Sequence, residues 1–430
     1  MARFDQDYLQ ALLDVEAALA AAEAEVGVIP ASSVGDIRAA ARSELYDAEA
    51  LASAAAADGN VAIPLVKKLT DAVAARNPDA ARHVHRGATS QDILDTAMVL
   101  RIRDASATLR ERLTRTMSGA AMLARTYAST PMPGRTWLQH ASPTTFGLKA
   151  AGWLDMAGRC RARLDAAVEQ ALVVQLGGAS GTLASLGSDG AAVTAALARH
   201  LRLRVPSMPW HTHRDRIAEV AAAFGICCGA LGKIGRDLTL LAQSEVGEAF
   251  ENPATAGGSS SMPHKQNPVR AVIAVSAAVR APALVSILLA AMPQEHERAA
   301  GGWQAEWGVL DELMSVTCES AAAIAGALAG LQVDPARMRA NLEMRGGIAM
   351  AEGLATALLP HVGRTVAMKQ VERLSRIAER DGRPLLEIAS ADADVSQWLS
   401  AREIAQALAP DAFLGSAGLY VERVLHEWSM

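Results

Sequence analysis

Gly257-Gly258-Ser259-Ser260-Ser261-Met262-Pro263-His264-Lys265-Gln266-Asn267-Pro268-Val269 is the stretch from which we interpret the whole chain. Its two glycines and three serines permit unusual backbone angles and can present N–H groups and hydroxyls to an anion. Lys265 and Asn267 can both bind a carboxylate, and the prolines beside them restrict the backbone. The apolar residues that start at Val269 predict a helix directly after the loop. We therefore interpret the stretch as an anion-binding loop, although its glycine and serine content alone would also fit a flexible linker.

The same stretch resembles the signature loop of the fumarase/aspartase superfamily, GSSxMPxKxNP, whose members make or break a bond β to a carboxylate. The resemblance implies that Ser259 and Lys265 are catalytic and that Asn267 binds substrate. Because three serines follow one another, Ser260 and Ser261 remain alternatives to Ser259. A serine hydroxyl is a poor acid or base unless its alkoxide is stabilised, which the loop N–H groups and Lys265 would do.

Composition favours an all-α fold. The 430 residues are 51% hydrophobic but only 4% aromatic, and the apolar residues are largely Ala, Leu and Val. Alanine is the best helix former, whereas sheets prefer β-branched and aromatic residues. The superfamily resemblance implies three helical domains around a central bundle of long helices. We place these domains at residues 1–101, 102–340 and 341–430, with a hinge at residues 345–347.

Charge and cysteine content exclude several classes of function. A net charge of −5 leaves no domain-wide basic surface for nucleic acid or an acidic membrane. The four cysteines form no CxxC pair, so neither a zinc site nor a disulfide framework is expected. His296 and Glu297 begin an HExxH-like pattern, but Ala300 stands where the second histidine would be. We expect no metal and no cofactor.

The sequence predicts neither a secretory signal nor a membrane span. Its N-terminus lacks a basic segment followed by an apolar one. The longest apolar run, residues 271–292, carries Arg280 and Pro282 near its middle. We therefore expect a cytoplasmic protein.

A sustained apolar repeat predicts one long helix over residues 215–251. Its apolar residues step alternately by three and four positions: Ile217, Val220, Phe224, Cys227, Leu231, Ile234, Leu238 and Leu241. Core packing accounts for most of them, but so long a seam exceeds the need of one chain. Together with the superfamily resemblance, this predicts a homotetramer with a central helical bundle and active sites shared between subunits.

A second loop of small polar residues covers residues 84–92. Thr89 and Ser90 stand directly before a predicted helix, where such residues most often cap the N-terminus. The loop also resembles the first conserved region of the superfamily, in which the matching threonine and serine bind a substrate carboxylate. The resemblance assigns substrate binding to Thr89, Ser90 and Gln91, a role that is compatible with capping.

Residues 133–147 are predicted to form a turn-rich start to the following helix. They resemble the second conserved region, but Trp137 stands where fumarases, argininosuccinate lyases and adenylosuccinate lyases place a functional histidine. Tryptophan cannot act as an acid or base, so Trp137 is either a wall of the substrate site or a packed aromatic residue. His140 is the available titratable group, with structural and catalytic roles both open. Gln139 is assigned to substrate binding.

Two further stretches complete the candidates. Residues 177–182, GGASGT, lack the spacing of a nucleotide-binding loop and are interpreted as a mobile connection. Residues 294–307 are dense in polar and aromatic groups and could form a solvated helix turn. They nevertheless resemble the corresponding stretch of bacterial 3-carboxy-cis,cis-muconate cycloisomerases, as do the Gln91 and Trp137 regions. The resemblance assigns Arg298 to substrate binding.

The resemblance implies a cofactor-independent cycloisomerase that acts on a small polycarboxylate in the protocatechuate branch of the β-ketoadipate pathway. Superfamily chemistry passes through a carbanion next to a carboxylate, delocalised as an aci-carboxylate dianion, so stabilising that charge is the main catalytic problem. In cycloisomerisation one carboxylate adds across the substrate's own double bond, so proximity is intrinsic and the enzyme mainly supplies a held conformation and a proton. The alternatives are an adenylosuccinate lyase or related C–N lyase, and an inactive helical scaffold.

Overall fold

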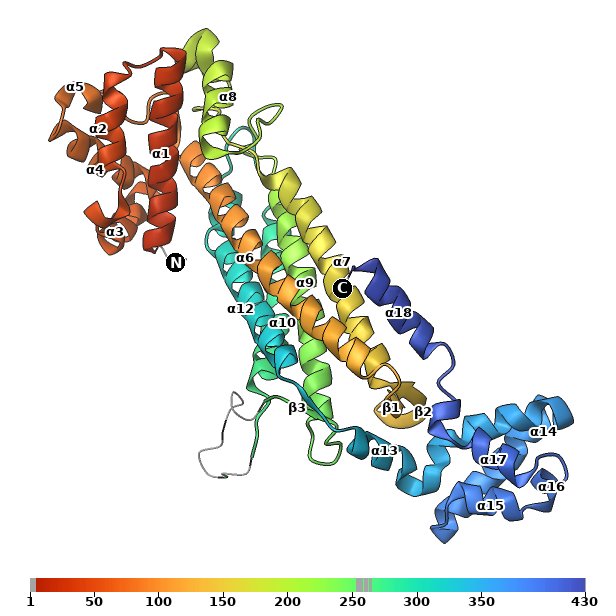
Figure 1. Cartoon of the computed structure of the whole chain (residues 1–430). Coiled ribbons are helices and arrows are strands. Elements are labelled where there is room, and N and C mark those ends of the chain that lie inside the picture. Colours follow the sequence, from red (N-terminus) through yellow and green to blue (C-terminus); the bar gives the residue numbers. More distant parts are fainter. Residues whose placement is uncertain (1–4, 253–257, 259–261, 263–264, 430) are drawn as a thin grey trace. The chain divides into compact units, whose positions relative to one another are not determined.

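The computed structural model describes residues 5–252, 258, 262 and 265–429 and is built almost wholly from α-helices (Figure 1). The predicted all-α class is therefore confirmed. Strands within the described ranges are confined to two short antiparallel pairs, β1 (Pro131–Thr136) with β2 (Gln139–Thr145), and β3 (Ala249–Phe250) with β4 (Gln332–Val333).

The chain divides into two compact units. The first comprises Met1–Glu111, Cys160–Gly229 and Ala277–Cys318, and the second comprises Arg112–Arg159, Ala230–Ser276 and Glu319–Met430. The boundaries fall within five long helices, so each unit contains part of each of these five. The three-domain division at residues 101 and 340 comes from the sequence and the superfamily resemblance, and it stays a prediction.

Five long helices contribute to both units. They are α6 (Ser90–Thr126), α7 (Phe146–Ala171), α9 (Asp215–Leu241), α10 (Val269–Ala290) and α12 (Val309–Ala329). The prediction that one helix runs to residue 251 is wrong, because α9 ends at Leu241 and Gly247 adopts a left-handed φ of +63° in the turn that follows. All eight residues of its apolar seam are buried within this chain. The seam therefore does not by itself require another subunit.

Shorter helices complete the first unit. They are α1 (Gln6–Val26), α2 (Ser32–Ala40), η1 (Ser43–Leu45), α3 (Ala48–Asp58), α4 (Ala62–Ala74), α5 (Pro78–Ala81), η2 (Ala184–Asp189), α8 (Gly190–Leu201) and α11 (Gly302–Glu306). The α1 helix packs against α8 and α2. Asp5 caps its start by accepting a hydrogen bond from the Tyr8 amide, and left-handed Gly27 ends it. Its leucines at positions 9, 12, 13 and 19 are buried, as their helical spacing predicts.

The second unit ends in a group of helices with a hydrophobic core of its own. They are α13 (Pro335–Glu343), η3 (Met344–Met350), α14 (Ala351–Asp381), α15 (Leu385–Ala391), α16 (Ala393–Ser396), α17 (Ala401–Ala407), η4 (Pro410–Ala412) and α18 (Ala417–Glu427). Leu354, Leu374 and Leu385 are central to this core. Arg345, Gly346 and Gly347 all adopt left-handed φ angles, which interrupts the helical path before α14. The predicted hinge thus coincides with a break in regular structure.

The α10 helix leaves much of its apolar surface uncovered. Val272, Val279 and Leu289 expose about half or more of their surface, and Val279 reaches 73%. By length and composition alone, α9, α10 and the segment Gly302–Ala329 could each cross a membrane. The expectation that no segment spans a membrane therefore stays a prediction. An exposed apolar surface of this kind is typical of an interaction site.

Candidate active site

The loop that carries Thr89 joins α5 to α6 within the first unit. Left-handed φ angles at His85 and Gly87 turn the chain, and α6 begins at Ser90. The Thr89 amide donates to the Asp92 carboxylate at 2.9 Å, which is one half of a capping box. Ser90 Oγ accepts from Asn60 Nδ2 at 3.4 Å. The Thr89 side chain is therefore not needed to cap the helix and is available for another partner.

That partner is Arg298. Its Nη1 donates to Thr89 Oγ1 at 2.9 Å, and its guanidinium lies over the ring of Trp303 with 5.8 Å to the centroid. Burial lowers the pKa of Arg298, while Asp92 and Asp95 oppose the shift. Within the described part of the chain no carboxylate forms an ion pair with Arg298. A half-buried arginine without a paired carboxylate, hydrogen-bonded to a threonine hydroxyl, is suited to receiving a carboxylate.

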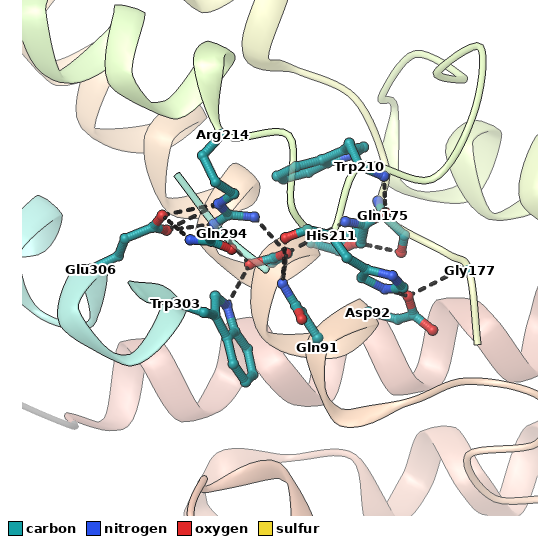
Figure 2. A network of polar contacts seen from close by, with 12 residues as sticks. Gln91, Asp92, Gln175, Gly177, Trp210, His211, Arg214, Gln294, Trp303 and Glu306 are labelled. Carbon is teal, nitrogen blue, oxygen red and sulfur yellow. Dashed lines mark hydrogen bonds and ion pairs between the residues drawn. The ribbon is translucent and has the colours of Figure 1, made fainter. Parts of the chain in front are cut away.

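A fully buried polar network, shown in Figure 2, lies next to the Thr89–Arg298 pair. Arg214 forms bidentate contacts with Asp95 at 2.8 and 3.1 Å and with Glu306 at 2.5 and 3.0 Å. Trp303 Nε1 donates to Asp95 at 3.1 Å, which ties the ring beneath Arg298 to the network. Burial alone would lower the pKa of Arg214, but Asp95 and Glu306 together raise it. Arg214 is therefore a permanent charge that orders the two carboxylates.

Burial changes the interpretation of residues 294–307 and of Gln91. Trp303 and Glu306 are buried whereas Glu295, His296 and Glu297 are exposed, so residues 294–307 are a solvated turn only in part. Gln91 is also fully buried, and its amide donates to Asp95 at 3.1 Å and to the His211 carbonyl at 2.8 Å. This burial favours a positioning role for Gln91 over direct contact with a substrate. Sequence reasoning missed Arg214, which stands among other polar residues in His213-Arg214-Asp215-Arg216 and carries no local signal that sets it apart.

The second unit presents a different set of candidates on the β1–β2 hairpin. The strands pair from Pro131 with Thr145 to Thr136 with Gln139, so the expected turn-rich helix start is instead a hairpin and α7 begins at Phe146. Prolines on both strands disfavour a helix here. Trp137 and Leu138 form the two-residue turn, with left-handed φ angles of +52° and +63°. Trp137 is 97% exposed, so it is not a packed aromatic residue in this chain.

His140 lies beside the turn and next to a buried ion pair. Arg135 donates to Glu248 through two nitrogens, at 2.9 and 2.6 Å, and Glu248 is fully buried. Burial lowers the pKa of His140, with Arg135 adding to the effect and Glu248 opposing it. His140 is therefore neutral at pH 7 and can accept one proton while donating another. Gln139, next to it, is exposed.

The signature loop is described only in part. Ser259, Ser260 and Ser261 lie outside the described residues, so their assignment stays a prediction. Lys265 is exposed, and Asn267 Nδ2 donates to the Gly258 carbonyl at 3.1 Å.

The helix after the loop begins at Val269, as the apolar run predicts. Two amides at the start of this helix already have a partner, because Arg270 N and Ala271 N donate to the Glu251 carboxylate. Glu251 is buried and already complements the positive end of the helix. Donors for a substrate anion must come from elsewhere in the loop.

The described residues contain no group of three or more His, Cys, Asp or Glu side chains that could hold a metal ion. The four cysteines are buried, and the expectation that they form no disulfide framework stays a prediction. Independence from metals and cofactors stays a prediction. The first unit contains Thr89, Ser90, Gln91 and Arg298, of which Thr89 and Arg298 are hydrogen-bonded to each other, and the second contains Trp137, Gln139, His140, Lys265 and Asn267.

Family models match most of the chain. A model described as Lyase matches residues 2–282, and one described as Adenylosuccinate lyase C-terminus matches residues 347–424. Together with the helical fold, these matches define the class of protein as a helical lyase. The chain belongs to the fumarase/aspartase superfamily of lyases.

Similar proteins cover nearly the whole chain. A 3-carboxy-cis,cis-muconate cycloisomerase of Pseudomonas aeruginosa is 50% identical over 98% of this chain and 92% of its own length. A nitrosuccinate lyase of Streptomyces davaonensis is 43% identical over 98% of this chain and 90% of its own. The crystal structure of 3-carboxy-cis,cis-muconate lactonizing enzyme from Pseudomonas putida matches with a TM-score of 0.93 at 45% identity, covering 98% of this chain and 94% of that one.

Proposed function

We propose that this chain is a 3-carboxy-cis,cis-muconate cycloisomerase that forms carboxymuconolactone in the protocatechuate branch of the β-ketoadipate pathway. The observation that carries the proposal is Trp137, which stands at the exposed tip of the hairpin where C–N lyases of the superfamily place a histidine. A tryptophan cannot protonate a leaving amine. Lactonisation has no leaving group, so it does not need an acid at that position.

The chemistry follows from intramolecular addition. An oxygen of one substrate carboxylate forms a bond to a carbon of the conjugated system, the double bond breaks, and its electron pair moves onto the carbon next to another carboxylate. That carbon then takes a proton. Arg298 and Thr89 hold a carboxylate, and the charge of Lys265 stabilises the developing dianion. Neutral His140 and Ser259 are the candidates for carrying the proton.

The enzyme works as a homotetramer in the cytoplasm, without metal or cofactor. The uncovered apolar face of α10 supports assembly, because Val272, Val279 and Leu289 on a long helix need apolar cover and a symmetric bundle of copies supplies it. Active sites are shared between subunits. Light scattering on purified protein tests the assembly, and a monodisperse monomer would contradict it.

A C–N lyase is the second candidate, since the nitrosuccinate lyase resembles this chain over nearly its whole length. One assay separates the two. Purified protein is offered 3-carboxy-cis,cis-muconate, adenylosuccinate, nitrosuccinate and fumarate separately, before and after exhaustive dialysis against EDTA. We expect turnover of carboxymuconate alone, unchanged by EDTA. Turnover of a C–N substrate alone would reverse the assignment, and the absence of any turnover would favour an inactive scaffold.

A further inference from the structure

The Asp92 carboxylate joins three segments that are far apart in the sequence. Its Oδ1 accepts from the Gly177 amide at 2.9 Å and from His211 Nε2 at 2.7 Å, and its Oδ2 accepts from the amides of Thr89 and Gly178, both at 2.9 Å. Figure 2 shows Asp92 with His211 and Gly177. Asp92 and His211 are 1% and 4% exposed. Residues 177 and 178, expected to belong to a mobile connection, are instead fixed at their amides.

Steric contacts independently indicate that these segments must lie close together. A Cβ added to Gly178 would lie 3.1 Å from the Gly87 carbonyl oxygen, and one added to Gly177 would lie 2.7 Å from the His211 ring. One added to Gly87 would overlap Leu186 at 2.5 Å. Glycine at all three positions therefore permits the approach that the Asp92 carboxylate then fixes.

We propose that Asp92 is the positioning residue of the carboxylate receptor, by which we mean the hydrogen-bonded pair of Thr89 and Arg298. Asp92 acts through Thr89 and is itself held in place by His211, Gly177 and Gly178. Asp92 does not touch the substrate, because all four of its contacts lie within the protein. By holding the Thr89 amide it fixes the Thr89 hydroxyl against Arg298, where the carboxylate is received. The inference rests on the proposed role of Thr89 and Arg298, and it adds a residue, a loop and a histidine that the superfamily resemblance did not assign.

Asp92→Asn is the sharpest test, because an amide has nearly the same shape but its NH2 group cannot accept from two of the four donors. The readout is the affinity for propane-1,2,3-tricarboxylate, a saturated tricarboxylate without a double bond to react, measured by calorimetry. We expect Asp92→Asn to weaken binding by about 10- to 100-fold, since small displacements of positioning groups have effects of this order.

A double-mutant cycle distinguishes positioning from general damage. If Asp92 acts through Thr89, Asp92→Asn weakens binding strongly in the wild-type background and by less than about 2-fold in the Thr89→Ala background. Equal weakening in both backgrounds would overturn the inference. Because the probe is not turned over, failure of carboxymuconate turnover alone would count against the proposed reaction and leave the positioning result intact. If wild-type protein did not bind the tricarboxylate at all, the proposed carboxylate-binding role of Thr89 and Arg298 would be wrong, and the inference about Asp92 would fail with it.

If the Asp92→Asn variant does not fold, alanine substitutions at Gly178 and at Gly181 provide a second test. Gly178 and Gly181 both have left-handed φ angles, of +65° and +83°, so alanine strains both backbones alike. Only the Gly178 Cβ meets the Gly87 carbonyl, whereas nothing lies within 4 Å of a Cβ at Gly181. We expect Gly178→Ala to weaken tricarboxylate binding by about 10-fold more than Gly181→Ala at similar thermal stability. Equal affinities would contradict the inference.

Discussion

Glu248 accepts two hydrogen bonds from Arg135 and a third, at 2.7 Å, from Asn341 Nδ2, so one fully buried carboxylate links the β1–β2 hairpin to α13. The Arg135 backbone pairs with His140 across the hairpin. Because a buried charge is costly without its partners, this carboxylate requires the arginine to stay in place. The position of the hairpin therefore depends on a residue 113 positions away from Arg135 along the chain.

Replacing that carboxylate should destabilise the protein. Glu248→Gln leaves Arg135 without its counter-ion, and we expect the free energy of unfolding to fall by about 3 kcal/mol, as for other buried pairs that lose one partner. Urea unfolding followed by circular dichroism measures the change. Glu44→Gln is the control, because the Arg42–Glu44 pair is exposed and should leave the midpoint unchanged. Equal effects of the two substitutions would contradict the structural role of Glu248.

Stability should depend on the protonation of Glu23. Burial raises the pKa of Glu23 to about 8, opposed by Arg86 and strengthened by Glu16. The folded state then binds more protons than the unfolded state between the ordinary carboxyl pKa of about 4.3 and pH 8, so the stabilisation is complete below this window and is lost as pH rises through it.

The measurement compares urea midpoints at pH 5, 6, 7 and 8. Glu23→Gln should show a smaller decline with pH than wild type, because glutamine cannot ionise. Glu25→Gln is the matched control: the pKa of exposed Glu25 is lowered by its hydrogen bond with Arg199, so its titration falls below this pH range. If Glu23→Gln and wild type declined in parallel, Glu23 would not titrate in this window.

The left-handed backbone of the Trp137–Leu138 turn should lower the stability of the protein, while the Trp137 ring should contribute to its activity. Left-handed backbone costs a non-glycine residue roughly 1–2 kcal/mol, and glycine's extra entropy in the unfolded chain offsets part of any relief. We expect Leu138→Gly and Trp137→Gly each to raise the melting temperature slightly. Only Trp137→Gly should lower kcat/KM for carboxymuconate, because it removes the exposed ring. A matching loss of kcat/KM in Leu138→Gly would show that the turn geometry, and not the indole, is required.

The imidazole of His140 should titrate below its ordinary value. Burial and the neighbouring Arg135 lower the pKa of His140, so we expect a midpoint below 6.5 by NMR of the imidazole carbon, with the signal assigned from its loss in His140→Gln. If His140 carries the proton as a base, kcat/KM declines on the acidic side of this midpoint. A titration midpoint above 7 would contradict the charge environment described for the hairpin.

Substitutions in the signature loop test the serine assignment. Ser259→Ala should lower kcat by about 10² to 10⁴, the range for one acid–base group, without altering the melting temperature. Lys265→Met should reduce both binding and turnover, since its charge faces the substrate and the dianion alike. If Ser260→Ala or Ser261→Ala abolished activity instead, the catalytic serine would lie in this loop but would not be Ser259. Wild-type kcat in all three serine variants would exclude a serine mechanism, leaving His140 as the first group to test.

The sequence by itself determined the helical class, because alanine content and the 3.6-residue period are local properties that tertiary contacts reinforce. It also determined the start of α10 and the loop at Thr89, since capping residues, glycine and proline act within a few positions. It did not determine the hairpin, because strand pairing depends on contacts across the turn as well as on local preference.

Only the tertiary structure decided which polar residues act together. Arg298 and Thr89 are separated by 209 positions, Arg214 and Asp95 by 119, and Asp92 and Gly177 by 85. No periodicity or motif relates residues at such distances, because the partner of a buried charge is fixed by packing of whole helices and not by neighbours in the chain. The same packing buried Gln91 and exposed Trp137, which reversed what residue type alone would suggest.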